Sequence, residues 1–515
     1  MPCKASWPRW LPTFAGSRKI RNRSINSTLS DGNQMTNIIK PEINVLSPDN
    51  RELLHQYSLD ILSEVGFRVD FKKARDLFAE KGFRVDDDHR VYIPSERVEW
   101  ACDKAPSVID IYNRLGKLTF QVGAAENNPT RFGVGVTNLY YQRPDNDRVE
   151  PFNRQHMALA AGLGDNLNEF DLIATPGVLK DLPPETADLF GTLEIVANTV
   201  KPIVLLVSNH RCFSAVLNML EHLCGELTTK PFVIPYFNPI TPFVLNEETA
   251  EKMMITAERG LPMIFNNYGM SGATAPITPG GTLAVLNAEL LAGLVYAQVL
   301  KEGTPIILGS LPAGFDMQTM QARYTPHTML LNLACAEMMA HYKLPHSGTS
   351  GSGPGWGPDL LASGMHWMNH LTSCLGKAGL APFCGGNLGS VAFSPAAVVS
   401  ANEIIAQARQ FRQGFSLDDT TVAPDDIAAI GPGGNFLMAD LTVKLCREID
   451  YNNPIWPDLS LEEWQNRDMP TVEKLLREYT INLLNNRTRP TDHAALIEKG
   501  EAYINKLTQQ FDVKS

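Results

Sequence analysis

The sequence predicts an α/β fold in which a (β/α)8 TIM barrel follows a small N-terminal α+β segment and precedes a C-terminal helical extension. Eight short apolar runs rich in β-branched residues lie between residues 132 and 385, and each is followed by a segment with the amphipathic pattern of a helix. Successive runs begin 30 to 43 residues apart, the length that one strand and one crossover helix need. Such unbroken β-then-α units are typical of a closed parallel barrel. An open, doubly wound sheet stays the alternative, because periodicity does not show closure.

The first 40 residues differ in character from the rest of the chain. They are basic, with Asp31 as the one acidic residue, and they show no sustained periodicity. They also lack the continuous apolar stretch of a secretory signal. We expect residues 1–40 to form a disordered extension.

Residues 41–128 are expected to form the α+β segment. Apolar residues recur at helical spacing from Leu53 to Phe78, and short β pieces are predicted at 67–69, 83–85 and 91–93. A further helix is expected over 95–104. Residues 108–122 are predicted to form a pair of strands.

The barrel is assigned to residues 129–415, and residues 416–515 are expected to form the helical extension. The eight predicted strands are 132–137, 170–175, 202–207, 232–237, 262–267, 305–310, 345–350 and 381–385. The predicted helices between and after them are 155–163, 184–200, 213–224, 247–259, 281–300, 326–342, 360–377 and 395–411. The extension contains a glycine-rich turn at 431–434, which is followed by charged segments that are predicted to be helical.

Composition restricts the class of partner. The formal net charge of −11 disfavours nucleic acid and anionic membranes as partners. The apolar stretch 281–300 is interrupted by Asn287 and Glu289, so no membrane span is expected. The eight cysteines form no CxxC pair, which indicates reduced thiols and a cytoplasmic location. A homo-oligomer is compatible with the sequence, which does not fix its state.

In a barrel the chemistry lies at the carboxyl ends of the strands, and here those ends are rich in aromatic and amide side chains. No lysine stands at a strand end, which disfavours a Schiff-base enzyme, and no His-x-His follows the first strand. Asp316 and Asp359 are the only carboxylates nearby, and each could simply cap a turn or a helix. His366 and His370 are one helical turn apart but lack a partner glutamate, so we expect no metal site.

A site with scarcely any general acid or base favours chemistry that moves no difficult proton. Aromatic faces attract quaternary ammonium groups through cation–π contacts worth about 0.5–2 kcal/mol each. We therefore expect an organic cation as the ligand.

Four segments resemble signatures of the trimethylamine methyltransferase family. They are LDILSEVG at 59–66, GMSGATAPIT at 269–278, NAELLAG at 287–293 and IGPGGNFL at 430–437. The likeness runs in order from about residue 48 to about residue 464. The resemblance implies a barrel that transfers a methyl group from a methylamine to the reduced cobalt of a separate corrinoid protein. It also implies that this chain binds no cofactor itself.

The sequence departs from the family pattern at three places. Members that act on trimethylamine hold pyrrolysine in the seventh βα region, which aligns here near Ser363 and Gly364. The chain therefore resembles the non-pyrrolysine branch, which includes glycine betaine methyltransferases. Asn435 stands where the family usually has histidine, and residues 351–356 are also atypical.

The resemblance and the strand-end residues together predict a quaternary amine as methyl donor, because its leaving group is a neutral tertiary amine that needs no acid catalyst. We expect Tyr236, Tyr268, Phe315 and Trp356 to form much of a cage around the cation. Asn238, Asn267 and His346 are expected to bind the polar end of the substrate. No catalytic residue is assigned.

Two other functions stay open on the sequence. One is a phosphate-binding barrel lyase or isomerase that uses the glycine-rich loops after the seventh and eighth strands, although these loops contain no lysine or arginine. The other is a non-catalytic betaine-binding protein with the same aromatic pocket.

Overall fold

The computed structural model describes residues 38–123, 129–135, 137–351, 353–446, 449 and 453–512. Its centre is a parallel sheet of seven strands in the order β16-β14-β12-β11-β10-β7-β19. The strands are β7 (Arg131–Val134), β10 (Phe170–Ala174), β11 (Ile203–Leu205), β12 (Val233–Phe237), β14 (Met263–Asn267), β16 (Ile306–Ser310) and β19 (Leu380–Cys384).

The remaining run, 345–350, closes the barrel. Parallel bridges join Leu308 to His346 and Ser347 to Leu380, so this short segment lies between β16 and β19, the two edges of the sheet. Backbone hydrogen bonds run to both neighbours, from Ser347 N to Leu308 O at 2.9 Å and from Leu380 N to His346 O at 2.8 Å. The predicted barrel is confirmed, and the open sheet is wrong.

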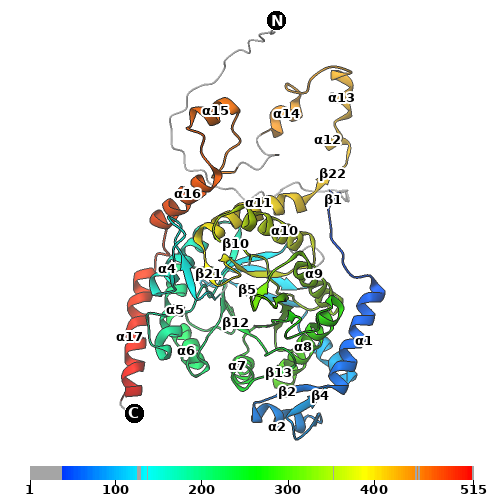
Figure 1. Ribbon diagram of the computed structural model, residues 1–515, viewed down its shortest axis with the longest axis vertical. Coiled ribbons are helices and arrows are strands. Elements are labelled where there is room, and N and C mark those ends of the chain that lie inside the picture. Colours follow the sequence, from blue (N-terminus) through cyan, green and yellow to red (C-terminus); the bar gives the residue numbers. More distant parts are fainter. Residues whose placement is uncertain are drawn as a thin grey trace.

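A helix follows each strand of the ring and lies on its outside (Figure 1). These helices are α4 (Arg154–Asn166), α5 (Pro184–Asn198), α6 (Phe213–Cys224), α7 (Glu247–Glu258), α8 (Pro279–Leu300), α9 (Pro326–His341), α10 (Leu360–Leu375) and α11 (Pro395–Gln413). Polar side chains cap several of them, as when Thr278 accepts from Gly281 N at the start of α8. Proline in the first turn favours α5, α8, α9 and α11.

Helix α8 is apolar around nearly its whole circumference. By length and composition it could cross a membrane, but 89% of its apolar window is buried inside the protein. It packs on β14 and β16 on one side and on α1 (Pro48–Glu64) and α3 (Ser95–Lys104) on the other. Because protein covers both sides, α8 is a core helix.

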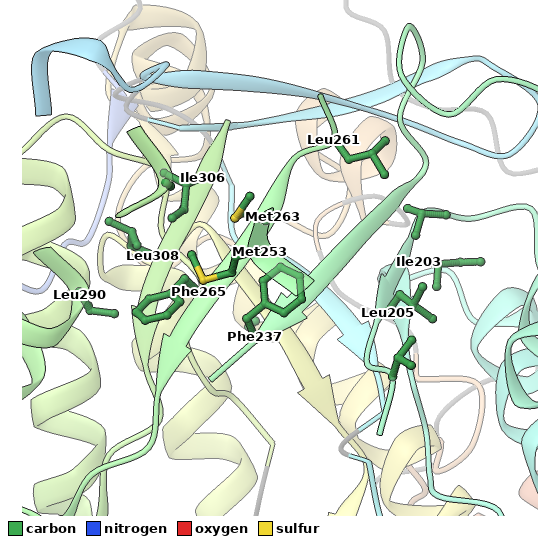
Figure 2. Packing of buried hydrophobic residues seen from close by; sticks show 14 of the residues in the cluster. Ile203, Leu205, Phe237, Met253, Leu261, Met263, Phe265, Leu290, Ile306 and Leu308 are labelled. Carbon is green, nitrogen blue, oxygen red and sulfur yellow. The ribbon is translucent and has the colours of Figure 1, made fainter. Parts of the chain in front are cut away.

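Strand residues alternate between the inside and the outside of the ring. Figure 2 shows Met263 and Phe265 of β14 in the outer cluster, between the strands and the helices, while Ile264 belongs to the cluster inside the ring. The hairpin of β5 (Val108–Tyr112) and β6 (Leu118–Gly123) contributes Ile111 and Phe120 to the inner cluster. Tyr112 N donates to Pro231 O, just before β12, so the hairpin closes the amino-terminal end of the barrel.

Short strands form two small sheets in the loops at the carboxyl end of the barrel. One has the order β15-β17-β18 and the other β20-β21-β8-β9. Their strands are β8 (Tyr140–Gln142), β9 (Val149–Pro151), β15 (Met270–Ser271), β17 (Ala313–Asp316), β18 (Gln321–Arg323), β20 (Gly386–Asn387) and β21 (Ala392–Phe393). A short 3-10 helix, η1 (His210–Cys212), follows β11. The loops after four of the strands, β7, β14, β16 and β19, therefore add short strands to the mouth of the barrel.

The N-terminal segment is joined to the barrel through a shared sheet of order β13-β2-β4-β3. Its strands are β2 (Phe67–Val69), β3 (Arg84–Val85) and β4 (Arg90–Tyr92), and α2 (Lys72–Glu80) packs beside them. β13 (Val244–Leu245) comes from the loop after β12. Of the expected disordered extension, residues 1–37 lie outside the described residues. Within 38–40, β1 (Ile38–Ile39) pairs with β22 (Phe415–Ser416).

The C-terminal part is helical, as the sequence predicts. Its helices are α12 (Asp419–Val422), α13 (Pro424–Ile430), α14 (Asp440–Leu445), α15 (Leu461–Asn466), α16 (Val472–Asn486) and α17 (His493–Asp512). α16 packs on α11, and α17 packs on α5 and α6. The helices α12 to α14 project away from the barrel (Figure 1) and bury no residue.

Candidate functional site

A cavity of about 370 Å³ lies where the strands end, and we call it the inner cavity. Its lining comes from the ends of β12 and β19 and from the segments that follow β7, β11, β12, β14, β16, the seventh strand segment and β19. The lining residues are Thr137, Leu206, Tyr236, Asn238, Tyr268, Leu311, Tyr324, Thr349, Phe383, Gly389 and Ser390. Its size suits a small organic ligand, and its position is the one that barrel enzymes use.

Aromatic rings are held in place within this lining by neutral hydrogen bonds. Asn238 Nδ2 donates to Tyr236 Oη at 3.0 Å and to Asn266 O at 2.8 Å, and the Tyr236 ring meets the Phe383 ring edge-on at 5.1 Å between centroids. The hydroxyls of Tyr268 and Tyr324 lie 3.4 Å apart. Burial raises the pKa of both Tyr236 and Tyr268, so these phenols stay un-ionised.

A second, wider hollow of about 860 Å³ adjoins the inner cavity, and we call it the outer groove. Tyr324 and Gly389 line both spaces, so they form the boundary between them. The rest of the groove includes Trp356, Leu361 and Val391. Apolar side chains dominate this open surface above the cavity.

The loop from β20 to β21 forms part of that boundary in a strained conformation. Leu388, Gly389 and Ser390 have φ values of 55°, 69° and 70°, the left-handed region that non-glycine residues rarely adopt. Leu388 N donates to Gly355 O at 2.8 Å and Gly389 N to Gly353 O at 3.1 Å, so the atypical glycine-rich segment fixes this loop. Such strain is common where a loop shapes a binding site.

Of the seven predicted binding residues, the structure brings three together. Tyr236, Asn238 and Tyr268 line the inner cavity. Trp356 lies in the outer groove, and its side chain is 75% exposed. Phe315 is on β17, half-buried, and does not belong to the inner-cavity lining.

Asn267 points away from the cavity and supports it from behind. Its Nδ2 donates to Leu286 O at 2.8 Å and to Glu289 Oε2 at 2.9 Å, both on α8. Glu289 also accepts from Thr241 Oγ1 at 2.8 Å and from Phe243 N at 2.6 Å, in the loop after β12. Burial raises the pKa of Glu289 to about 7.

His346 is fully buried in the seventh strand segment and is absent from the inner-cavity lining. Burial lowers its pKa to about 3, so the imidazole is neutral at physiological pH. Its Nδ1 faces Gly379 N at 3.4 Å.

Three of the remaining candidates for acid, base or metal chemistry, Asp316, Asp359 and His370, have structural partners. Asp359 caps α10 by accepting from Ala362 N at 2.8 Å, and Asp316 accepts from Gln318 N at 2.8 Å. His370 Nδ1 lies 2.8 Å from Ser350 Oγ, and both His366 and His370 are buried. Among the described residues, no group of three or more His, Cys, Asp or Glu is arranged to hold a metal ion.

The prediction from sequence missed several lining residues, of which Tyr324 and Ser390 matter most. Tyr324 follows a hairpin, β17–β18, inserted after β16, and Ser390 lies in the β20–β21 turn. Both are several residues beyond the strand ends. The length of the segment between the sixth strand and its helix is the signal that could have located Tyr324.

Comparison with known proteins places this chain in a family. A profile described as trimethylamine methyltransferase (MTTB) matches residues 15–512. The chain belongs to the trimethylamine methyltransferase family. The resemblance seen in the four sequence segments is thereby confirmed, and membership supports methyl transfer as the general activity.

Relatives in this family cover most of the chain at low identity. The trimethylamine methyltransferase MttB of Desulfitobacterium hafniense (strain DSM 10664 / DCB-2) is 27% identical, covering 87% of each chain. MttB of Methanosarcina barkeri (strain Fusaro / DSM 804) is 26% identical over 91% of this chain and 96% of its own. A glycine betaine methyltransferase of Desulfitobacterium hafniense (strain Y51) is 24% identical over 90% of this chain and 97% of its own.

A solved structure shows the same fold. The monomethylamine methyltransferase of Methanosarcina barkeri matches with a TM-score of 0.54 at 10% identity, covering 87% of this chain and 89% of the other. At this identity the likeness supports the barrel fold alone. Ser363 and Gly364, the two residues singled out in the sequence, lie on α10 outside the inner-cavity lining.

Proposed function

We propose that this chain transfers a methyl group from a quaternary amine to the Co(I) of a corrinoid carried by a separate protein. The observation that carries the proposal is the inner cavity itself. Its lining residues include three tyrosines and one phenylalanine, and none of them is Asp, Glu, Lys, Arg or His. Family membership and the relatives that act on trimethylamine and glycine betaine support a methylated amine as the substrate.

The lining suits a permanent cation better than a group that must gain or lose a proton. Each aromatic face attracts a quaternary nitrogen by about 0.5–2 kcal/mol. The phenols keep their protons because burial raises their pKa, so the cation meets ring faces and not fixed negative charge. A cavity of this kind binds the cation without trapping it in an ion pair.

The transfer step needs no general acid. The carbon–nitrogen bond breaks with both of its electrons staying on nitrogen, which leaves a neutral tertiary amine. Cobalt supplies the electron pair for the new bond to carbon and is formally oxidised from Co(I) to Co(III). The protein's part is to hold the cation, align one N–CH3 bond and exclude water.

The outer groove gives the second substrate its access. It is open, largely apolar and continuous with the inner cavity at Tyr324 and Gly389. Such a surface suits a large planar group presented by another protein. In this arrangement the residues of this chain bind the methyl donor, and the other protein brings the corrinoid.

The direct test is to mix the chain with cob(I)alamin, kept reduced by Ti(III) citrate, and with one quaternary amine at a time. We expect methylcobalamin and the corresponding tertiary amine to form in equal amounts. Binding of an amine without either product, relative to a reaction without protein, would contradict the proposal and favour the non-catalytic binder.

A further inference from the structure

The polar groups of the inner cavity are all neutral. Besides the three phenols, they are the hydroxyls of Thr137, Thr349 and Ser390 and the amide of Asn238. This holds for the described residues; residues 136 and 352, which are not among them, are valine and serine in the sequence.

The Ser390 hydroxyl is the sealed member of these groups that has no partner inside the protein, since its Oγ is buried and has no hydrogen-bond partner among the described residues. The backbone at Ser390 is fixed, because Asn138 Nδ2 donates to Ser390 O at 2.7 Å. A buried hydroxyl without a partner costs free energy, and a ligand that offers a hydrogen bond removes this cost.

The cationic side chains near the site lie outside the inner-cavity lining. Arg323 lines the outer groove, is 62% exposed at its side chain and pairs with Asp316 at 3.2 Å. Lys252 donates to Val207 O at 3.2 Å and is absent from the inner-cavity lining. His346 is neutral because burial lowers its pKa to about 3.

These observations indicate which chemical group the substrate carries at the end opposite its quaternary nitrogen. A carboxylate enclosed in this cavity would lose its water and gain no cationic partner, which is costly in an apolar environment. A hydroxyl or ether oxygen loses little free energy on entering the cavity, because Ser390 and its neighbours replace the hydrogen bonds that it made to water. Sites that pair polar groups in this way discriminate strongly between analogues.

We propose that the preferred methyl donor is a quaternary ammonium compound with an uncharged hydrogen-bonding end, such as a hydroxyl, bound by Ser390, and not a zwitterion with a carboxylate. This inference rests on the proposed function and narrows its substrate class. It sets this chain apart from the relative that acts on glycine betaine.

The test compares two probes with the same trimethylammonium group, choline and glycine betaine, by calorimetry on the full chain. We expect a Kd for choline at least tenfold lower than for glycine betaine. Equal or tighter binding of glycine betaine overturns the inference but leaves the proposed function standing, provided that it is demethylated. If cob(I)alamin takes no methyl group from either probe, or from any other quaternary amine, both proposals fail.

A variant tests the hydroxyl contact. Ser390→Ala should raise the Kd of choline at least fivefold and leave that of tetramethylammonium, which has no polar end, within twofold. Ser390→Cys, which keeps the shape of the side chain but donates only a weak hydrogen bond, serves if Ser390→Ala does not fold. An equal loss for both probes in the folded variant overturns the assignment of the hydroxyl end to Ser390.

Discussion

Single side chains divide the site into an inner part that holds the cation and an outer part that does not. Tyr268 lines the inner cavity, whereas Trp356 is 75% exposed in the outer groove. A ring contributes to cation binding when it lies within about 6 Å of the charge, and it contributes most when it is shielded from water. The position of each ring, and not its chemical type, therefore decides its role.

The first prediction contrasts these two rings. Tyr268→Ala should raise the Kd of a bound quaternary amine at least tenfold, which is about 1.4 kcal/mol. Trp356→Ala should change it less than threefold. Isothermal titration of both variants measures this, and a larger loss for Trp356→Ala would place the cation in the outer groove instead.

The second prediction concerns Glu289 and pH. Its pKa is raised from 4.5 to about 7 by burial, so the folded chain binds this proton more tightly than the unfolded chain. The stabilisation is fully present below the unfolded pKa and is lost as pH rises through about 7. From about pH 5 to about pH 8, the stability of the wild type relative to Glu289→Gln should therefore fall by about 2.5 kcal/mol. Urea unfolding of both proteins across that range checks this, and parallel curves would contradict it.

Strand alternation explains why the sequence located only part of the site. Asn266 and Asn267 are adjacent, so they point to opposite sides of β14. Asn266 faces inward and donates to Ser347 O at 3.1 Å, while Asn267 faces α8. The end of a strand is evident from the sequence, but which of two neighbouring amides faces inward depends on the exact register. Ser390 and Tyr324 lie on inserted turns, whose paths depend on contacts far away in the chain.

At the scale of elements, the barrel closes through a very short strand. The segment 346–347 makes one bridge to β16 and one to β19, and Gly309 of β16 lies against it. A Cβ at Gly309 would lie 1.5 Å from Ser347 O, so only glycine allows this approach. We call this contact between β16 and the segment 346–347 the seam of the barrel. The seam therefore depends on the absence of a side chain at Gly309.

The third prediction follows from that contact. Gly309→Ala should destabilise the fold by at least about 2 kcal/mol, because the backbone at the seam must move. Gly314→Ala, on the neighbouring strand β17, meets nothing closer than 3.6 Å and should stay within about 0.5 kcal/mol of the wild type. Chemical denaturation of the pair measures the difference, and equal stabilities would show that the seam tolerates a side chain.

The main elements could be predicted because their patterns are long and regular. The strand runs and the helices between them recur at a spacing that only a strand and a crossover helix fit. The small sheets at the mouth could not be predicted, since strands of two to four residues such as β15 and β20 carry too little pattern. Their pairing depends on which loops the barrel brings together.

At the scale of the whole molecule, residues 417–446 form an arm whose apolar side chains are not covered by the rest of the chain. No residue of the arm is buried. Its large exposed apolar side chains include Leu417, Val422, Ile427, Phe436, Leu437, Met438 and Val443. An apolar surface of this extent normally packs against another protein.

We expect a second copy of this chain to be the partner that covers this surface. The corrinoid protein of the proposed function must leave after each transfer, which would expose the arm again at every cycle. Permanently associated interfaces are the apolar ones, and identical subunits are the commonest permanent partners. A self-association through the arm keeps it covered throughout.

The last prediction is that the chain is an oligomer that depends on the arm. Sedimentation velocity should give a mass of at least two copies for the wild type, and the double variant Leu437→Asp with Met438→Asp should shift it toward one copy. Leu115→Asp changes a side chain of similar exposure, 68%, in the turn of the β5–β6 hairpin and should leave the mass unchanged. A wild type that sediments as one copy at micromolar concentration would show that the arm serves another partner, since water alone does not stabilise an exposed apolar segment of this size.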